Sequence, residues 1–489
     1  MASFSALLPC AVVIAAILCL RSSAVSAAAL AMMTALAIWL AGVFVSPNLG
    51  TLWAAALDAV VLELLVAAVI LPGILFVVST DRVGAPAAIG SVMQALKLED
   101  TKAAILIATG IGVMLESLTG FGVSLLVTVP LLLTVLDRSR AIAFALIGMS
   151  LMPWGALSIS AHLGAELAGL SLQRLAIMAW WISGPVALVL PLLCFLFAST
   201  RSFSLLGFSV SAGIVLSGAI GLATLLVGVE LAGVAGGLAV IIFSLLVAGR
   251  QDRLRSVLGA PELLPYGLLV FAVLAQKLIV PWLTTAGVAP AFSTGRVTFT
   301  ILTSPGVALI AATAATVCVF QSRLGSDTAG PTLVVSLWQR GWRPLLSILF
   351  FMISARLLLE AGAIAALADV IADLGAYPAL IAVTLLGAVS GYITGGGLAG
   401  NALFMPSAAA VGERLDALPL FAALQHGAAG HVAMAALPVA AILLAALPSR
   451  EENDERSTIK IGLQLSLLYV LLLIAIGLLA MISSPHSGG

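Results

Sequence analysis

Charged residues are scarce in this sequence. Lys and Arg number 21, Asp and Glu number 21, and together they make up 9% of 489 residues, whereas soluble domains carry about 25%. Hydrophobic residues make up 62% of the chain, and the mean hydropathy is +1.23. A water-soluble fold cannot hide that much apolar surface, because its outside has to be covered by polar groups. The composition therefore excludes a soluble protein and indicates that lipid surrounds most of the chain.

Other absences exclude further classes of function. The net charge is zero and neither end carries a basic or acidic tail, so we expect no nucleic-acid partner. The four cysteines all lie in apolar runs, which is typical of buried small side chains rather than disulfides or metal ligands. The sequence has no His-Glu-x-x-His cluster, phosphate-binding glycine loop or nucleophile elbow. We expect no metal, no cofactor and no enzymatic activity.

Long apolar runs predict the membrane topology. A helix that crosses a bilayer needs about 20 mostly apolar residues, and placing the basic loops in the cytoplasm puts every Lys and Arg cluster on one side. A small-residue stretch at 24–27 resembles a signal cleavage site, but no basic residue precedes it, which favours a retained first span. The predicted crossings are 5–20, 26–45, 54–78, 141–158, 173–198, 204–228, 231–248, 263–283, 299–320, 346–367, 417–447 and 461–482.

Two further apolar stretches, 103–136 and 378–411, are interrupted in the middle by glycines. The first would measure about 51 Å as one helix, too long for one crossing and too short for two. We therefore predict re-entrant hairpins, one entering from each side. The fold expected is all-α and polytopic, with about 12 transmembrane helices plus two hairpins in an inverted-topology repeat. The halves are 1–249, with hairpin 103–136 and following span 141–158, and 250–489, with hairpin 378–411 and following span 417–447.

The interruptions share a motif. ESLTGFG at 116–122 and GYITGGG at 391–397 place Thr-Gly-x-Gly 275 residues apart, and Gly155 and Gly430 repeat at the same spacing. Two broken helices that enter from opposite sides indicate a transporter whose site lies where they meet.

The chemistry of a broken helix fits an anion. Freed backbone groups are tolerated in a membrane only where they are buried in protein or line a cavity, and the start of a half-helix directs N–H groups at negative charge. The alternative is that these glycines only allow close helix packing. The predicted substrate-binding residues are Thr119, Gly120, Phe121, Gly122, Thr394, Gly395, Gly396, Gly397, Asn401 and His431.

At these motifs the chain resembles the lactate permease family. LESLTGFG at 115–122 looks like the family's LEGAAGFG, and WGA at 154–156 resembles its FGA. TG at 394–395 and NALF at 401–404 match the ends of its TGSDTSSNALF. The resemblance implies a secondary transporter that moves L-lactate, glycolate or similar 2-hydroxy monocarboxylates with protons across a bacterial inner membrane.

The chain also departs from the family pattern. GGLAG at 396–400 replaces Ser-Asp-Thr-Ser-Ser, GMSL at 148–151 replaces Asn-Thr-Ala-Pro, and His431 follows Gly430 where the family has Lys. These departures are those of a divergent member. They leave open another organic anion, sodium in place of protons, or an anion channel.

Three polar residues within predicted apolar stretches have competing interpretations. Glu116 borders the first break, and an intramembrane carboxylate is costly when charged, so we expect it to couple proton movement; the alternative is a structural carboxylate. Arg356 and Glu360 share a helix face, which favours an ion pair between them over an anion contact of Arg356. His431 is either an anion contact or a packing histidine. The oligomeric state is left open.

Overall fold

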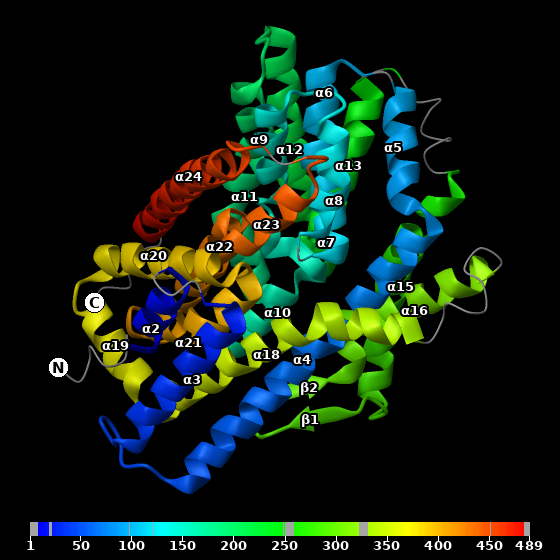
Figure 1. Cartoon of the computed structure of the whole chain (residues 1–489). Coiled ribbons are helices and arrows are strands. Elements are labelled where there is room, and N and C mark those ends of the chain that lie inside the picture. The colour runs from blue at the N-terminus through cyan, green and yellow to red at the C-terminus, as the bar shows by residue number, and fades with distance from the viewer. Residues whose placement is uncertain are drawn as a thin grey trace.

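The structure is a computed structural model that describes residues 8–18, 22–96, 98–120, 122–247, 249, 259–321, 331–449 and 451–483. In these ranges the regular structure is helical apart from one antiparallel ribbon, β1 (Ala291–Ser293) with β2 (Thr298–Thr300). Figure 1 shows the helices stacked around a buried centre, with the ribbon at the margin beside α4. An all-α polytopic fold is confirmed.

The first half of the chain contains α2 (Leu8–Leu18), α3 (Ala24–Leu40), α4 (Leu49–Val83), α5 (Ala85–Leu96), α6 (Asp100–Ile105), the π-helix η1 (Leu106–Gly112), α7 (Val113–Thr119), α8 (Val123–Leu132), α9 (Arg138–Met149), η2 (Met152–Trp154), α10 (Gly155–Ala168), α11 (Leu172–Phe197), α12 (Phe203–Leu226), η3 (Val229–Leu231) and α13 (Ala232–Val247). The second half contains η4 (Pro261–Leu263), α15 (Leu264–Thr285), η5 (Ile301–Thr303), α16 (Pro305–Val319), α18 (Pro331–Glu360), α19 (Ala363–Ala372), α20 (Ala376–Thr394), α21 (Gly397–Arg414), α22 (Leu418–Val432), η7 (Ala433–Ala435), α23 (Leu437–Ala445) and α24 (Asp454–Ser483).

Among the described residues, nine helices are long and apolar enough to cross a membrane, or eleven if two bent pairs each count as one span. Several of the twelve predicted crossings have wrong bounds; 141–158, for example, ends ten residues before α10 does. The stretch 299–320 begins in β2 and η5, so its helix, α16, is short. The stretch 346–367 joins two helices, because Gly362 takes a left-handed conformation with φ +76° and separates α18 from α19.

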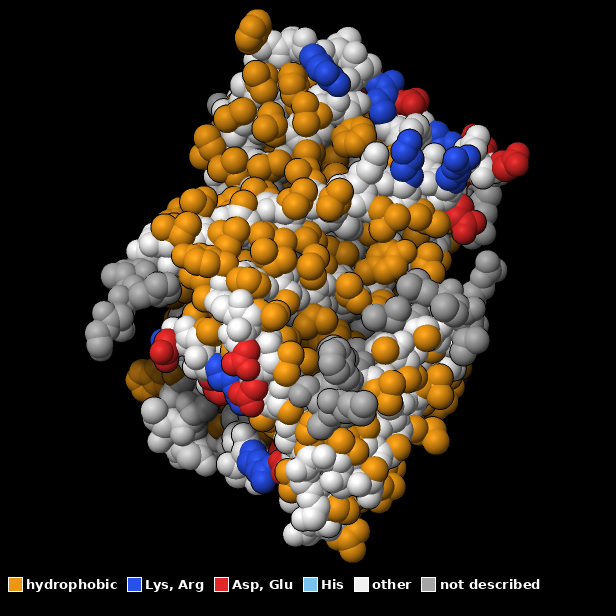
Figure 2. Space-filling view, turned by 90° about the vertical axis from the view of Figure 1, so that its left-hand side faces the viewer, with side chains coloured by type: hydrophobic (Ala, Val, Ile, Leu, Met, Phe, Trp, Pro, Cys, Tyr) orange, Lys and Arg blue, Asp and Glu red, His pale blue; other side chains and the backbone are white. Residues whose placement is uncertain are grey.

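Surface chemistry agrees with a membrane protein. Figure 2 shows hydrophobic side chains over the broad middle of one face, while Lys, Arg, Asp and Glu gather toward its upper right and lower left. Large apolar side chains such as Phe203, Leu226 and Trp282 are mostly exposed. Exposed apolar surface on this scale is stable only where lipid covers it.

Each interrupted stretch is a helix, a glycine break and a second helix that packs back on the first. In the first stretch, α8 contacts η1 and α7; in the second, α21 contacts α20. The breaks occur where Gly120, Gly122 and Gly395 take φ of +69°, +78° and +75°, a region that side chains with a Cβ rarely enter. The side of the membrane from which each hairpin enters stays a prediction.

The span after each hairpin is bent. The α9–α10 pair bends by 48° and the α22–α23 pair by 41°. At the first bend, Pro153 lies in η2, and Ala156, Leu157 and Ser158 follow with φ of 48°, 53° and 58°. At the second bend, Pro438 starts α23. Proline interrupts a helix because it lacks the backbone donor.

Helices of the two predicted halves lie against one another. The long helix α18 packs on α3 and α4, α16 packs on α4, and α11 packs on α22. The bent span α10 contacts both α7 of the first hairpin and α21 of the second. A division at residue 249 or 250 stays a prediction, and its two parts share an extensive buried boundary.

Candidate functional site

The first hairpin tip is built around Glu116. Its Oε2 accepts a hydrogen bond from Ser124 Oγ at 2.8 Å, and its Oε1 accepts one from Gly122 N–H at 3.3 Å. The Glu116 side chain is buried. A carboxylate from the end of α7 therefore occupies the start of α8, the place where the sequence led us to expect substrate. Phe121 lies outside the described residues.

The second hairpin tip has no carboxylate. Thr394 Oγ1 donates to Ser390 O at 2.7 Å, and Gly395 N–H donates to Gly391 O. At the start of α21, no side chain of the described residues caps the helix at Gly396. The N–H groups that begin α21 are thus open to an acceptor in a way that those of α8 are not.

Both tips rest on the same bent span. A Cβ atom at Gly120 would lie 2.5 Å from the Cβ of Ala156, and one at Gly397 would lie 3.7 Å from the Cβ of Ser160. The structure thus brings the two motifs to adjacent turns at the buried start of α10.

The second repeated glycine lies near the hairpin of its own half in both cases. A Cβ at Gly155 would lie 3.7 Å from Glu116 O, and one at Gly397 would lie 3.2 Å from the Cα of Gly430. Each of these glycines therefore packs against the hairpin tip of its own half. Their places in the bent spans differ, because Gly155 begins α10 after η2, whereas Gly430 lies in α22 before η7 and its added Cβ would lie 2.5 Å from Pro153 Cγ.

The two bent spans meet at His431. Its Nδ1 donates to Ser150 O at 2.5 Å, and its ring lies 6.4 Å from Trp154 and 5.9 Å from Tyr469, measured between centroids. Ser150 Oγ donates to Tyr469 Oη at 2.8 Å. The Nε2 atom of His431 has no hydrogen-bond partner among the described residues.

Asn401 also links the halves. Its Nδ2 donates to Ser160 O at 2.9 Å and lies 3.0 Å from His426 Nδ1, while its Oδ1 finds no partner in the described part of the chain. Asn401 and His431 therefore hold α21 and α22 against the first bent span.

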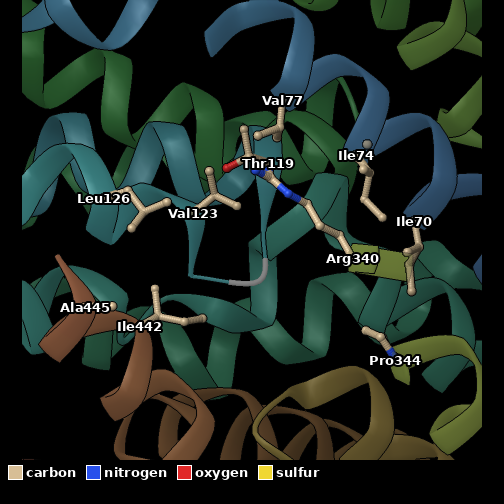
Figure 3. A pocket seen from close by; sticks show the side chains of 11 residues that line it. Ile70, Ile74, Val77, Thr119, Val123, Leu126, Arg340, Pro344, Ile442 and Ala445 are labelled. Carbon is tan, nitrogen blue, oxygen red and sulfur yellow. The ribbon is translucent and has the colours of Figure 1, made fainter. Parts of the chain in front are cut away.

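A cavity of about 450 Å³ opens beside the first tip (Figure 3). Two polar side chains enter it, Thr119 from the end of α7 and Arg340 from α18, and Figure 3 shows the Arg340 guanidinium extending toward Thr119. Its other lining residues come from α4, α8, α18 and α23 and are apolar: Ile70, Gly73, Ile74, Val77, Val123, Leu126, Pro344, Ile442 and Ala445.

Sequence reasoning missed Arg340, because we expected it in a loop before a span starting at residue 346. The helix α18 starts at Pro331 and continues through Pro344, so Arg340 lies on a helix, where it lines the cavity and is exposed. Arg340 makes no close ion pair with any described residue, although Asp81 on α4 lies near enough to feel its charge. The neighbouring Arg343 stacks on Trp342 instead, 5.2 Å from its ring centroid.

The predicted pair of Arg356 with Glu360 is wrong. Arg356 Nη1 lies 4.0 Å from Asp58 Oδ2, and Glu360 pairs with Arg296. Both partners come from distant elements, since Asp58 lies on α4 and Arg296 follows β1. Arg356 is buried and does not line the cavity at the first tip.

Ion pairs join the two halves on either side of these contacts. Arg138 at the start of α9 pairs with Asp454 at the start of α24, with 2.5 Å between Nη2 and Oδ2. Lys277 on α15 pairs with Glu230 on η3 at 2.7 Å, and His162 Nε2 lies 3.5 Å from the same carboxylate. Sequence reasoning missed both pairs, since such distant partners leave no local pattern.

Comparison with known proteins identifies one family. Residues 268–483 match the model of the L-lactate permease family. This match is consistent with a lactate permease family member and confirms the resemblance over the second half of the chain, which holds the motif at 394–404. The matched residues include Arg340 and the second hairpin, whereas the first hairpin precedes them. No curated protein matches the chain.

The lactate permease match supports a multi-pass membrane transporter rather than an enzyme. Among the residues that the structure describes, no group of three or more His, Cys, Asp or Glu side chains is placed to hold a metal ion. The chemistry on offer is binding: one guanidinium, one hydroxyl, and backbone N–H groups at broken helices.

Proposed function

We propose that this chain is a secondary transporter of a small organic anion, a 2-hydroxy monocarboxylate such as lactate or glycolate, which moves with protons by alternating access. The observation that supports it is the cavity at the first tip, where Arg340 and Thr119 enter an otherwise apolar space. A membrane transporter of anions needs such a combination, because apolar walls exclude water while a few polar groups orient the ligand.

Arg340 binds the substrate carboxylate, since a guanidinium presents two parallel donors to the two carboxylate oxygens. Thr119 recognises the 2-hydroxyl group. Its own proton is already donated to Leu115 O at 2.6 Å, so Thr119 Oγ1 is left as an acceptor. Gly120, Phe121 and Gly122 complete this half of the site.

The second tip supplies the other half in the proposal. Thr394, Gly395 and Gly396 lead into the uncapped start of α21 at Gly397, where backbone N–H groups attract an anion. Asn401 and His431 position this tip through their bonds to Ser160 O and Ser150 O. Arg356, held by Asp58, is the weaker candidate for an anion contact.

Glu116 couples the proton. As a carboxylate it accepts from Gly122 N–H and Ser124 Oγ; as a carboxylic acid it has its own proton to donate and accepts less strongly. Protonation therefore loosens the break that carries Thr119 into the cavity. Alternating access further requires that the pairs Arg138–Asp454 and Lys277–Glu230 open in turn, because each joins the two halves.

Purified protein in liposomes tests the proposal. We expect labelled lactate or glycolate to accumulate above its outside concentration under an inward proton gradient. If only a sodium gradient drives accumulation, the coupled ion is sodium rather than the proton. If the substrate equilibrates without accumulating, the protein acts as a channel. Absence of carboxylate movement under all gradients would contradict the proposal.

Arg340→Gln and Arg343→Gln form the matched pair for the site. Both remove one positive charge from the same turn of α18, but Arg343 does not line the cavity. We expect Arg340→Gln to raise the KM for lactate at least tenfold, since the charge-assisted pair with the substrate carboxylate is lost. Equal effects of the two variants would remove Arg340 from the site.

A further inference from the structure

We infer that the cavity beside the first tip takes monocarboxylates with an apolar chain longer than that of lactate, with about six to eight carbons. This inference rests on the proposed function, because it concerns the substrate of the same site. It follows from the size of the cavity, its lining and the placement of its single cation.

Size is the first observation. Lactate and glycolate have about five to six non-hydrogen atoms and would take up roughly 150–180 Å³ if each atom occupies the ~30 Å³ of a water molecule. The cavity measures about 450 Å³. Either acid would leave more than half of this space to water or to lipid chains.

The lining decides what fills the remainder. Apart from Thr119 and Arg340, every described side chain that lines the cavity is apolar, and these side chains come from four helices. Away from Thr119 and Arg340, these walls offer water few of the two to four polar partners that hold it in place. An aliphatic chain would bury its surface there and gain affinity with each methylene.

Charge limits the substrate to one carboxylate. Arg340 is the one charged residue among the described lining residues, and Figure 3 shows it on the same side of the cavity as Thr119. Asp81 on α4 lies near Arg340 and would repel a second negative group. A monocarboxylate can place its head between Arg340 and Thr119 and its chain along Ile74 and Ile442.

Gly73 provides a variant that changes the size of the cavity alone. It lines the cavity on α4, and a Cβ atom added there would meet nothing within 4 Å. The Cβ of a leucine at this position would therefore meet no neighbour, and we expect its side chain to extend into the cavity. Gly218 on α12 also has open space around an added Cβ and does not line the cavity, so Gly218→Leu is the matched control.

The experiment measures competition in liposomes. Labelled lactate exchange is followed without a pH gradient, because longer acids cross lipid in their neutral form and would collapse one. Unlabelled straight-chain acids and 2-hydroxy acids of two to ten carbons compete, and methyl hexanoate serves as the uncharged control. We expect inhibition to strengthen about two- to fourfold per methylene up to six to eight carbons, and methyl hexanoate to have little effect.

Gly73→Leu should remove most of this chain-length dependence while lactate exchange continues, and Gly218→Leu should leave it unchanged. If longer acids inhibit lactate exchange no better than propionate does, the inference is overturned and the proposed function still stands. If Gly73→Leu leaves the chain-length dependence unchanged, the inference is also overturned, because the aliphatic chain of the acid then binds in lipid or elsewhere on the protein. No exchange of any monocarboxylate would instead overturn the proposed function.

Discussion

Ser124 donates its hydroxyl proton to Glu116 across the first helix break, and the two buried side chains are 2.8 Å apart. The second break has no equivalent, because no described side chain caps α21. The two hairpins share glycine positions, but the N-termini of their second helices have different hydrogen-bond partners. The Glu116 carboxyl group already lies at the start of α8, whereas no described side chain caps the start of α21.

Glu116→Gln tests the coupling role of this carboxylate. Glutamine can still accept from Gly122 and is neutral, so it imitates the protonated acid. We expect uptake driven by a proton gradient to fall at least tenfold, while lactate exchange at equal pH is largely kept. Ser124→Ala is the control that removes the hydrogen bond but not the carboxylate. Equal loss of gradient-driven uptake and exchange in Glu116→Gln would show a structural role.

Thr119→Val tests recognition of the 2-hydroxyl group. The variant keeps the shape of the side chain and removes the acceptor, so binding of lactate should weaken about fivefold to tenfold, the effect of one net hydrogen bond. Propionate lacks the hydroxyl group and should compete as before. The control is Thr128→Val on α8, which breaks the similar bond from Thr128 Oγ1 to Ser124 O away from the cavity. If Thr119→Val weakens the binding of lactate and of propionate equally, Thr119 does not contact the 2-hydroxyl group.

Gly120→Ala tests the fit of the first tip against α10. Gly120 takes φ +69° and ψ −173°, and an added Cβ would lie 2.5 Å from the Cβ of Ala156. We expect a loss of stability of about 2–4 kcal/mol from backbone strain and overlap, measured as a lower unfolding temperature in detergent. Gly396→Ala is the matched control, because Gly396 is extended and its added Cβ meets nothing within 4 Å. Similar stability of the two variants would mean that the tip packs differently.

His431→Ala tests the contact between the bent spans. The variant leaves Ser150 O without its donor at a buried position, which should cost about 1–3 kcal/mol of stability. His431→Asn retains a side-chain N–H donor and should recover part of that loss. Tyr469→Phe removes the neighbouring bond from Ser150 Oγ without touching the Ser150 carbonyl. An unfolding temperature unchanged in His431→Ala would contradict the contact.

Much of the fold follows from local sequence. Apolar runs set most helices, and the helices break at Gly120, Gly122 and Gly395 because only glycine enters their backbone conformation at little cost. The bends of the spans that follow were not predicted, although Pro153 and Pro438 mark them. The π-helix η1 and the ribbon of β1 and β2 were not predicted either, because neither has a distinctive periodic pattern of apolar residues.

The polar contacts depend on packing between distant elements, which limits prediction of the site. Arg356 was assigned to Glu360 because they lie four residues apart, yet Asp58 on α4 lies opposite Arg356. Arg340 was assigned to a basic loop because it lies between the predicted spans 299–320 and 346–367, yet α18 already begins at Pro331. Sequence places a charge on a helix, but the choice of partner depends on which helices pack together.

Residues 156–158 form a left-handed turn made of Ala, Leu and Ser, none of which favours that hand. Opposite handedness costs roughly 1–2 kcal/mol per residue, so this short piece of backbone stores energy that the surrounding packing has to hold. Gly120 lies against Ala156, the first residue of this turn, and Gly397 approaches Ser160, two residues after the turn ends. Because both hairpins rest on this one piece of backbone, we expect that displacing either hairpin would disturb the support of the other.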